Sequence, residues 1–253
     1  MAEVLTAKHS ADSGHWYKAD GTPAYTYINK KGEEKPTTLR EARKLDLVPS
    51  VTTIISCASA PQLVNWKIDQ AILSSLTLTR NEAETEQEYL ARIKADAQEQ
   101  AKKAAERGTY IHAIVQSGFE GKFIPIEYET YYCSARDTLF SATDNEQWTC
   151  EKPFATDRFG GKADLHTLKF LIDIKTTDKP IDGLKLWDNH YLQLAAYRVG
   201  LEIYEAQCGI LYINSVTAES KLIWADEKEL GKGWKCFSAL LDYYYAKTNL
   251  GGE

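Results

Sequence analysis

Residues 160–176 read GGKADLHTLKFLIDIKT, and this stretch decides the fold that we expect for the whole chain. Two short runs rich in apolar and β-branched residues flank a polar break at residues 167–169, which is the pattern of a tight antiparallel hairpin. In the second run, Asp173 and Lys175 are two residues apart and share one face, while the isoleucines beside them point into a core. The hairpin thus carries charge on a face that would be apolar in a fully buried sheet.

The first run brings a second carboxylate toward the same place. By the two-residue period of a strand, Lys162, Asp164 and His166 share one face. If the hairpin closes around residues 168–169, Asp164 falls roughly opposite Asp173, and cross-strand neighbours project to the same side of a sheet. Two carboxylates and the lysine of the second run are therefore expected to converge.

This group of side chains has a chemical use and also a simpler explanation. Hard cations such as Mg²⁺ bind to carboxylates together with water and substrate phosphate, and an adjacent lysine can hold a water or balance developing charge. Alternatively, the same residues form a solvated strand face that carries an ordinary ion pair. The hairpin alone does not separate the two, so the rest of the chain has to decide.

The composition indicates a globular chain with an acidic balance. Of the 253 residues, 43% are hydrophobic and 26% are charged, which suits one large domain, or a domain with an appended lobe, and a sizeable core. The formal net charge is −6, so nucleic-acid binding is not indicated by bulk charge and would need a local basic surface.

The five cysteines are odd in number, widely spaced and without a CxxC pair, which indicates reduced thiols and neither a zinc site nor an iron–sulfur cluster. No signal peptide is recognisable, and no apolar run is long enough to span a bilayer. We therefore expect a cytoplasmic protein with no membrane partner.

Upstream of the hairpin, the chain reads as a small β-meander followed by helices. Tyrosines alternate with polar residues in residues 15–36, and this spacing favours packing in a small sheet over stacking on bases. Hydroxyl residues at 50–53 either cap the next element or offer donors to a phosphate, and capping is the default. Residues 61–76 predict a helix with an apolar side formed by Leu63, Trp66, Ile68, Ile72 and Leu73.

Residues 84–118 predict one long helix or two helices broken at residues 107–109, because a glycine weakens a helix by only about 1 kcal/mol. Its buried stripe is expected to comprise Tyr89, Leu90, Ile93, Ala97, Ala101, Ala104 and Ala105. In the second half, His112 and Gln116 lie four residues apart on one face. A single helix histidine is more often structural than functional.

Three further elements surround the hairpin. Residues 148–155 predict a strand, on which Glu151 either lies near the acidic centre or is a solvated edge residue. Residues 189–201 predict a helix with Gln193 and Tyr197 on one face. Two strands at 208–214 and 221–225 and a helix at 227–247 complete the chain.

The motifs RGTYIH, GGKAD, DIKT and QLAAY, in this order, resemble the PD-(D/E)XK nuclease superfamily, specifically its RecB-like exonuclease branch and related phage proteins. The resemblance covers about residues 100–213. It implies a mixed α/β fold with a restriction-endonuclease-like core, in which helices flank a central mixed β-sheet. The core would comprise residues 100–253, and residues 1–99 would form a β-hairpin and helical extension that is part of the DNA channel.

The resemblance also implies a role for each motif residue. The metal ligands would be His112, Asp164, Asp173 and the backbone carbonyl of Ile174. The catalytic group would be Asp164, Asp173 and Lys175, with Lys175 activating water or stabilising the phosphate. The DNA-binding and supporting residues would be Gln193, Tyr197, Arg107 and Thr176, with Glu151 as an additional candidate.

The function that this implies is a Mg²⁺-dependent DNA nuclease, with Mn²⁺ as a substitute, acting as an exonuclease in phage or bacterial recombination or repair. Two alternatives remain: a catalytically silent DNA-binding or scaffold module of the same fold, and a structure-specific endonuclease. The partners would be a duplex end or single strand of DNA, an annealing protein for single strands, and further copies of the chain. Local cations for DNA are Lys102, Lys103, Arg107, Lys179, Lys185 and Arg198.

Overall fold

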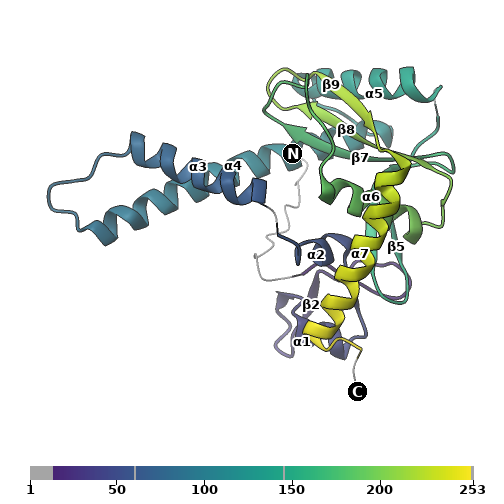
Figure 1. The fold of residues 1–253 in the computed structure, drawn as a ribbon, viewed down its shortest axis with the longest axis horizontal. Coiled ribbons are helices and arrows are strands. Elements are labelled where there is room, and N and C mark those ends of the chain that lie inside the picture. Colours follow the sequence, from purple (N-terminus) through teal and green to yellow (C-terminus); the bar gives the residue numbers. More distant parts are fainter. Residues whose placement is uncertain (1–13, 60, 145, 252–253) are drawn as a thin grey trace.

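A five-stranded mixed sheet forms the centre of the computed structural model, which describes residues 14–59, 61–144 and 146–251 (Figure 1). Its strands, in spatial order, are β5 (Thr149–Ala155), β6 (Gly160–His166), β7 (Phe170–Thr177), β8 (Gln207–Asn214) and β9 (Ser220–Trp224). All neighbours are antiparallel except β7 and β8, which run parallel. Parallel neighbours need a crossover, and helix α6 (Asp188–Gly200) supplies it.

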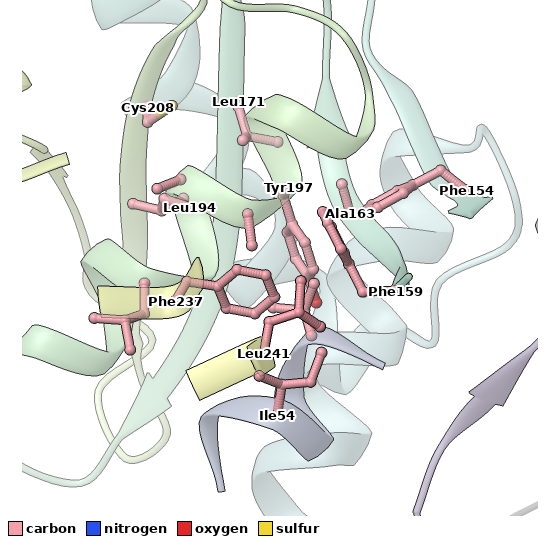
Figure 2. Packing of buried hydrophobic residues seen from close by; sticks show 14 of the residues in the cluster. Ile54, Phe154, Phe159, Ala163, Leu171, Leu194, Tyr197, Cys208, Phe237 and Leu241 are labelled. Atoms are coloured by element: carbon pink, nitrogen blue, oxygen red, sulfur yellow. The ribbon is translucent and has the colours of Figure 1, made fainter. Parts of the chain in front are cut away.

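Helices cover both faces of this sheet, which confirms the predicted mixed α/β fold class. On one face, α6 and α7 (Glu227–Thr248) and the short α2 (Val51–Ile55) enclose the larger hydrophobic cluster, which includes Ala163, Leu171 and Phe237 (Figure 2). On the other face, α4 (Glu86–Phe119) and α5 (Glu129–Thr143) enclose a second cluster built from Leu165 and Ile172. A 3₁₀ turn, η1 (Ile126–Tyr128), precedes α5.

The N-terminal part packs onto the larger cluster. Strand β1 (Trp16–Tyr17) pairs with β4 (Val48–Pro49), β2 (Thr26–Ile28) pairs with β3 (Glu34–Pro36), and α1 (Leu39–Lys44) follows. The side chain of Ser50 accepts a hydrogen bond from the backbone of Thr53, so the hydroxyl run caps α2, as the default interpretation predicted. Trp16 and Tyr17 are buried, which supports the packing role of the aromatic residues.

Residues 1–13 of the predicted extension lie outside the described residues. The division of the chain into an extension and a core at residue 99 stays a prediction. Part of residues 14–59 shares the larger hydrophobic cluster with the predicted core.

Helices α3 (Pro61–Thr77) and α4 form a long arm that projects from the body (Figure 1). The chain passes through Gly108 without a break, so the stretch that could be one helix or two is one helix of 34 residues. Among the described residues, no helix combines the length and the hydropathy that crossing a bilayer requires. All five cysteines are free thiols: Cys57, Cys133, Cys150, Cys208 and Cys236.

Candidate active site

The candidate site lies where β6 and β7 stop pairing. The two strands pair at Leu165 with Ile172 and at His166 with Leu171, and the next pair in this register would be Asp164 with Asp173, as predicted. The ladder ends there, and Asp164 Oδ2 instead accepts a hydrogen bond from the backbone N–H of Ile174 at 2.7 Å. Because the N–H and C=O of a strand residue point to the same side, the Ile174 carbonyl also faces this gap.

The regular alternation of β5 and β6 breaks at the same level. Ala163 and Leu165 are two residues apart, yet they belong to the clusters on opposite faces of the sheet. On β5, Cys150 and Phe154 are four residues apart and should share a face, yet they also belong to the clusters on opposite faces of the sheet. Between them Glu151 has a φ of 47°, a left-handed conformation that costs an ordinary residue roughly 1–2 kcal/mol. The prediction that Lys162, Asp164 and His166 share one face of their strand is therefore wrong.

Helix α4 brings His112 onto the gap from the second face. A Cβ atom at Gly108 would lie 2.5 Å from Thr176 Oγ1, so the absence of a side chain allows α4 to cross the end of β7 closely. One turn later, His112 Nε2 lies 2.9 Å from Asp164 Oδ2. Its side chain is a quarter exposed, so solvent reaches the site from this side.

Helix α6 supplies the opposite wall. Gln193 Nε2 donates to Asp173 Oδ1 at 2.8 Å and to the Tyr197 hydroxyl at 3.1 Å. Gln193 Oε1 accepts from Lys175 Nζ at 3.2 Å, and Lys175 Nζ lies 2.7 Å from Asp173 Oδ2. Gln193 and Tyr197 therefore share one face of their helix, as predicted, and the amide fixes the relative positions of Asp173 and Lys175.

The two carboxylates ionise differently. Burial disfavours the charged form of Asp164, but His112 and Lys175, together with the N–H of Ile174, hold its pKa below its usual range. For Asp173, burial is the largest influence, and with the charge of Asp164 it raises the pKa to about 6 despite the opposing effect of Lys175. Burial would lower the pKa of Lys175, yet the two aspartates raise it above its ordinary value.

His112 is affected by the same charges. Burial alone would lower the pKa of its imidazole, but the charge and hydrogen bond of Asp164, with the charge of Asp173, raise it above its ordinary value. The ionised form of Asp164 and the protonated form of His112 therefore stabilise each other.

Three of these side chains have the spacing of a metal site. Ligand atoms of His112, Glu151 and Asp164 all lie within 4.8 Å of one another. Asp173 lies outside this trio, and its buried Oδ2 has the ammonium of Lys175 as its neighbour at 2.7 Å. Three carboxylates, an imidazole and a strand carbonyl suit a hard divalent cation, so the donor set fits Mg²⁺ or Mn²⁺.

The structure brings Glu151 into the site and places the other supporting candidates differently. Arg107 donates to the backbone carbonyl of Ser215, so in this structure its guanidinium is held there. Thr176 lies under α4 at Gly108. The contact between Lys162 and Glu151 was not predicted, although the position of Lys162 two residues before Asp164 was a usable signal.

Comparisons with solved structures found chains that are described as exonucleases. A provisionally named exonuclease from Eubacterium rectale is 12% identical, with a TM-score of 0.40 over 58% of this chain and 69% of that one. The alkaline exonuclease of Laribacter hongkongensis is 14% identical, with a TM-score of 0.33 over 73% of this chain and 94% of that one. The phage-related exonuclease of Haemophilus somnus is 13% identical, with a TM-score of 0.30 over 54% of this chain and 79% of that one.

No protein-family model and no curated protein matches the chain. At these TM-scores the structural likeness carries no argument about chemistry. The functional argument therefore rests on the side chains that converge at the gap between β6 and β7.

Proposed function

We propose that the chain is a Mg²⁺-dependent DNA nuclease that hydrolyses phosphodiester bonds, and that it acts as an exonuclease in phage or bacterial DNA recombination or repair. The observation that carries this proposal is the linked group at the gap. Asp164 contacts His112, and Asp173 contacts Lys175 at 2.7 Å and Gln193 at 2.8 Å, while Lys175 and Gln193 contact each other at 3.2 Å. A module that only binds DNA gains nothing from burying two carboxylates together, since their repulsion costs stability.

The residues that would hold the ion are His112, Glu151, Asp164, Asp173 and the carbonyl of Ile174. When bound, Mg²⁺, or Mn²⁺ in its place, would neutralise charge at the scissile phosphate and favour attack by water. The ion would also lower the repulsion between the acidic centre and DNA, which explains how a chain of net charge −6 can bind a polyanion.

Lys175 is the residue that we assign to the reacting groups. Its side chain is one-third exposed and its ammonium is fixed by Asp173 and Gln193, so it can donate to the attacking water or to a phosphate oxygen. Tyr197 accepts from the amide of Gln193 and so helps to hold it in this orientation. Lys162 contacts Glu151 and limits the charge of the acidic group before an ion binds.

The setting of the activity follows from the same proposal. A DNA exonuclease of recombination would work in the bacterial cytoplasm or in an infected cell, on a duplex end or a single strand. An annealing protein that binds the strand left by digestion would be its functional partner.

The test is cleavage of end-labelled linear DNA and covalently closed circular DNA with Mg²⁺, Mn²⁺ or EDTA. We expect metal-dependent loss of the linear DNA only. Lys175→Met and Asp164→Asn should each lower the rate by about 100-fold or more, because each removes a group that stabilises the transition state. Lys228→Met, at an exposed lysine of α7, is the matched control and should retain full activity.

Glu151→Gln tests the metal ligands separately. If Glu151 binds the ion, this variant should need at least about 10-fold more Mg²⁺ for half-maximal rate. Cleavage of circular DNA would instead show an endonuclease. DNA retardation without cleavage under any metal would refute the enzyme and favour a binding module.

A further inference from the structure

A second lysine lies at the acidic group, in addition to Lys175. Lys162, on β6, contacts the carboxylate of Glu151, and its side chain is 37% exposed. One oxygen of the same carboxylate lies within 4.8 Å of ligand atoms of His112 and Asp164, which complete the trio with metal-site spacing. The ammonium and a divalent cation would therefore bind to the same carboxylate, where two cations repel each other.

The two lysines differ in what holds them. Lys175 contacts Asp173 at 2.7 Å and donates to Gln193 at 3.2 Å, and both of these partners lie outside the trio. An ion held by the trio therefore leaves the amide partner of Lys175 in place. The contact of Lys162, by contrast, is to a member of the trio. An ion at this position would displace Lys162 and leave Lys175 fixed.

The other acids beside Lys162 already have partners. The charges of Asp164 and Glu120 both act on Lys162. Glu120, which follows α4, contacts Lys122 and accepts a hydrogen bond from Gln116 Nε2 at 2.9 Å. Asp164 is held by the contacts with α4 and β7 that define the site. An ammonium displaced from the trio can therefore turn on its flexible stem toward an anion from outside the chain.

The backbone at Glu151 argues against a purely structural ion pair. A partly exposed ion pair adds little to stability and needs no unusual backbone. Glu151 nevertheless has a φ of 47°, a conformation that is unfavourable for a residue with a side chain. Such strained conformations gather at sites that bind ligands, where the position of one side chain matters more than its local cost.

We propose that Lys162 and the divalent cation exchange at Glu151. The ammonium neutralises this carboxylate in the metal-free protein, and on metal binding it turns to solvent and binds a phosphate of the DNA. This inference rests on the metal site of the proposed function and adds a role for a residue outside the motifs. It also links the two ligands: DNA that binds the displaced ammonium raises the affinity for the metal by the same factor by which the metal raises the affinity for DNA.

The first experiment measures Mn²⁺ binding to the full chain without DNA, with free Mn²⁺ followed by electron paramagnetic resonance. Lys162→Met should bind Mn²⁺ about 10-fold more tightly than wild type, because the competing charge is gone, and Lys162→Gln should show the same gain. Lys162→Arg keeps the charge and should bind as wild type does. Lys152→Met removes the same charge from an exposed residue of β5 and is the matched control, with a change below about 2-fold.

A double-mutant cycle separates exchange at Glu151 from a general effect of charge. In Glu151→Gln the ammonium has lost its carboxylate, so the addition of Lys162→Met should raise the Mn²⁺ affinity by less than about 3-fold. Equal gains in both backgrounds would overturn the exchange. A wild type that binds Mn²⁺ and a Lys162→Met variant that binds it no better would overturn the exchange and leave the metal site intact. A wild type that binds no Mn²⁺ would overturn both.

The second experiment measures DNA retardation in the Lys175→Met background, in which cleavage is blocked. With Mn²⁺, the addition of Lys162→Met should weaken binding about 10-fold and reduce the salt dependence of log K by about 1, because one phosphate contact is lost. With EDTA, Lys162 stays at Glu151, so the salt dependence should not change. An equal reduction with Mn²⁺ and with EDTA would overturn the release of Lys162.

Discussion

Replacing Asp173 with Asn should change how the stability of the metal-free protein depends on pH. The ordinary pKa of an aspartate is 3.8, and burial raises that of Asp173 to about 6 in the folded protein. This gap of about 2 pKa units corresponds to about 3 kcal/mol. Asn keeps an oxygen that can accept the hydrogen bond from Gln193 Nε2, so the amide network is preserved.

The sign follows from the protons bound in each state. Between about pH 3.8 and pH 6 the folded protein holds a proton on Asp173 that the unfolded chain has lost, so stability falls as pH rises. The stabilising contribution is complete below the unfolded pKa and is lost once pH passes about 6. The neutral asparagine has no such dependence. The variant should therefore gain about 3 kcal/mol relative to wild type between about pH 4 and pH 6.5.

The assay is urea unfolding at several pH values with EDTA present, with the free energy of unfolding of the variant compared with that of wild type at each pH. Lys175 stays charged across this range, and its attraction to the ionised form of Asp173 is already included in the pKa of about 6, so it adds no separate pH dependence. Asp182→Asn, at a fully exposed aspartate, is the control and should follow wild type. A difference between Asp173→Asn and wild type that stays constant with pH would refute the reasoning.

Two further predictions concern single positions. Gly108→Ala should destabilise the protein by about 1–3 kcal/mol, because the new Cβ would lie 2.5 Å from Thr176 Oγ1. The control is Gly231→Ala in α7, whose Cβ would meet no atom within 4 Å, and it should be neutral or stabilising in thermal unfolding. His190 is buried, and this burial, followed by the charge of Lys175, lowers its pKa to about 4. As the pH drops from about 6.5 to 4, the unfolded chain binds the proton before the folded protein does, so the free energy of unfolding falls. His190→Asn should lose about 3 kcal/mol less than wild type over this range, and equal losses in urea unfolding would show that His190 does not titrate there.

The hairpin and the α6 pair were predictable because they depend on short sequence separations. The two-residue period put Asp173 and Lys175 on one face, and the turn position put Asp164 opposite Asp173. The four-residue spacing of Gln193 and Tyr197 likewise fixed their shared side. In each case the local geometry of one element, or of two elements joined by a tight turn, decides the neighbours.

The tertiary structure decided what depends on contacts between distant elements. Glu151 joins His112 and Asp164 through a left-handed backbone conformation, which its surroundings hold and its residue type does not indicate. His112 reaches the site because α4 crosses β7 at Gly108, a contact between segments far apart in the sequence. The apolar side predicted for α3 shows the same limit: of its five residues, Leu63, Ile68, Ile72 and Leu73 are at least half exposed, which only the fold revealed. A sequence period gives the face of a helix, and the other elements that pack around the helix determine what that face contacts.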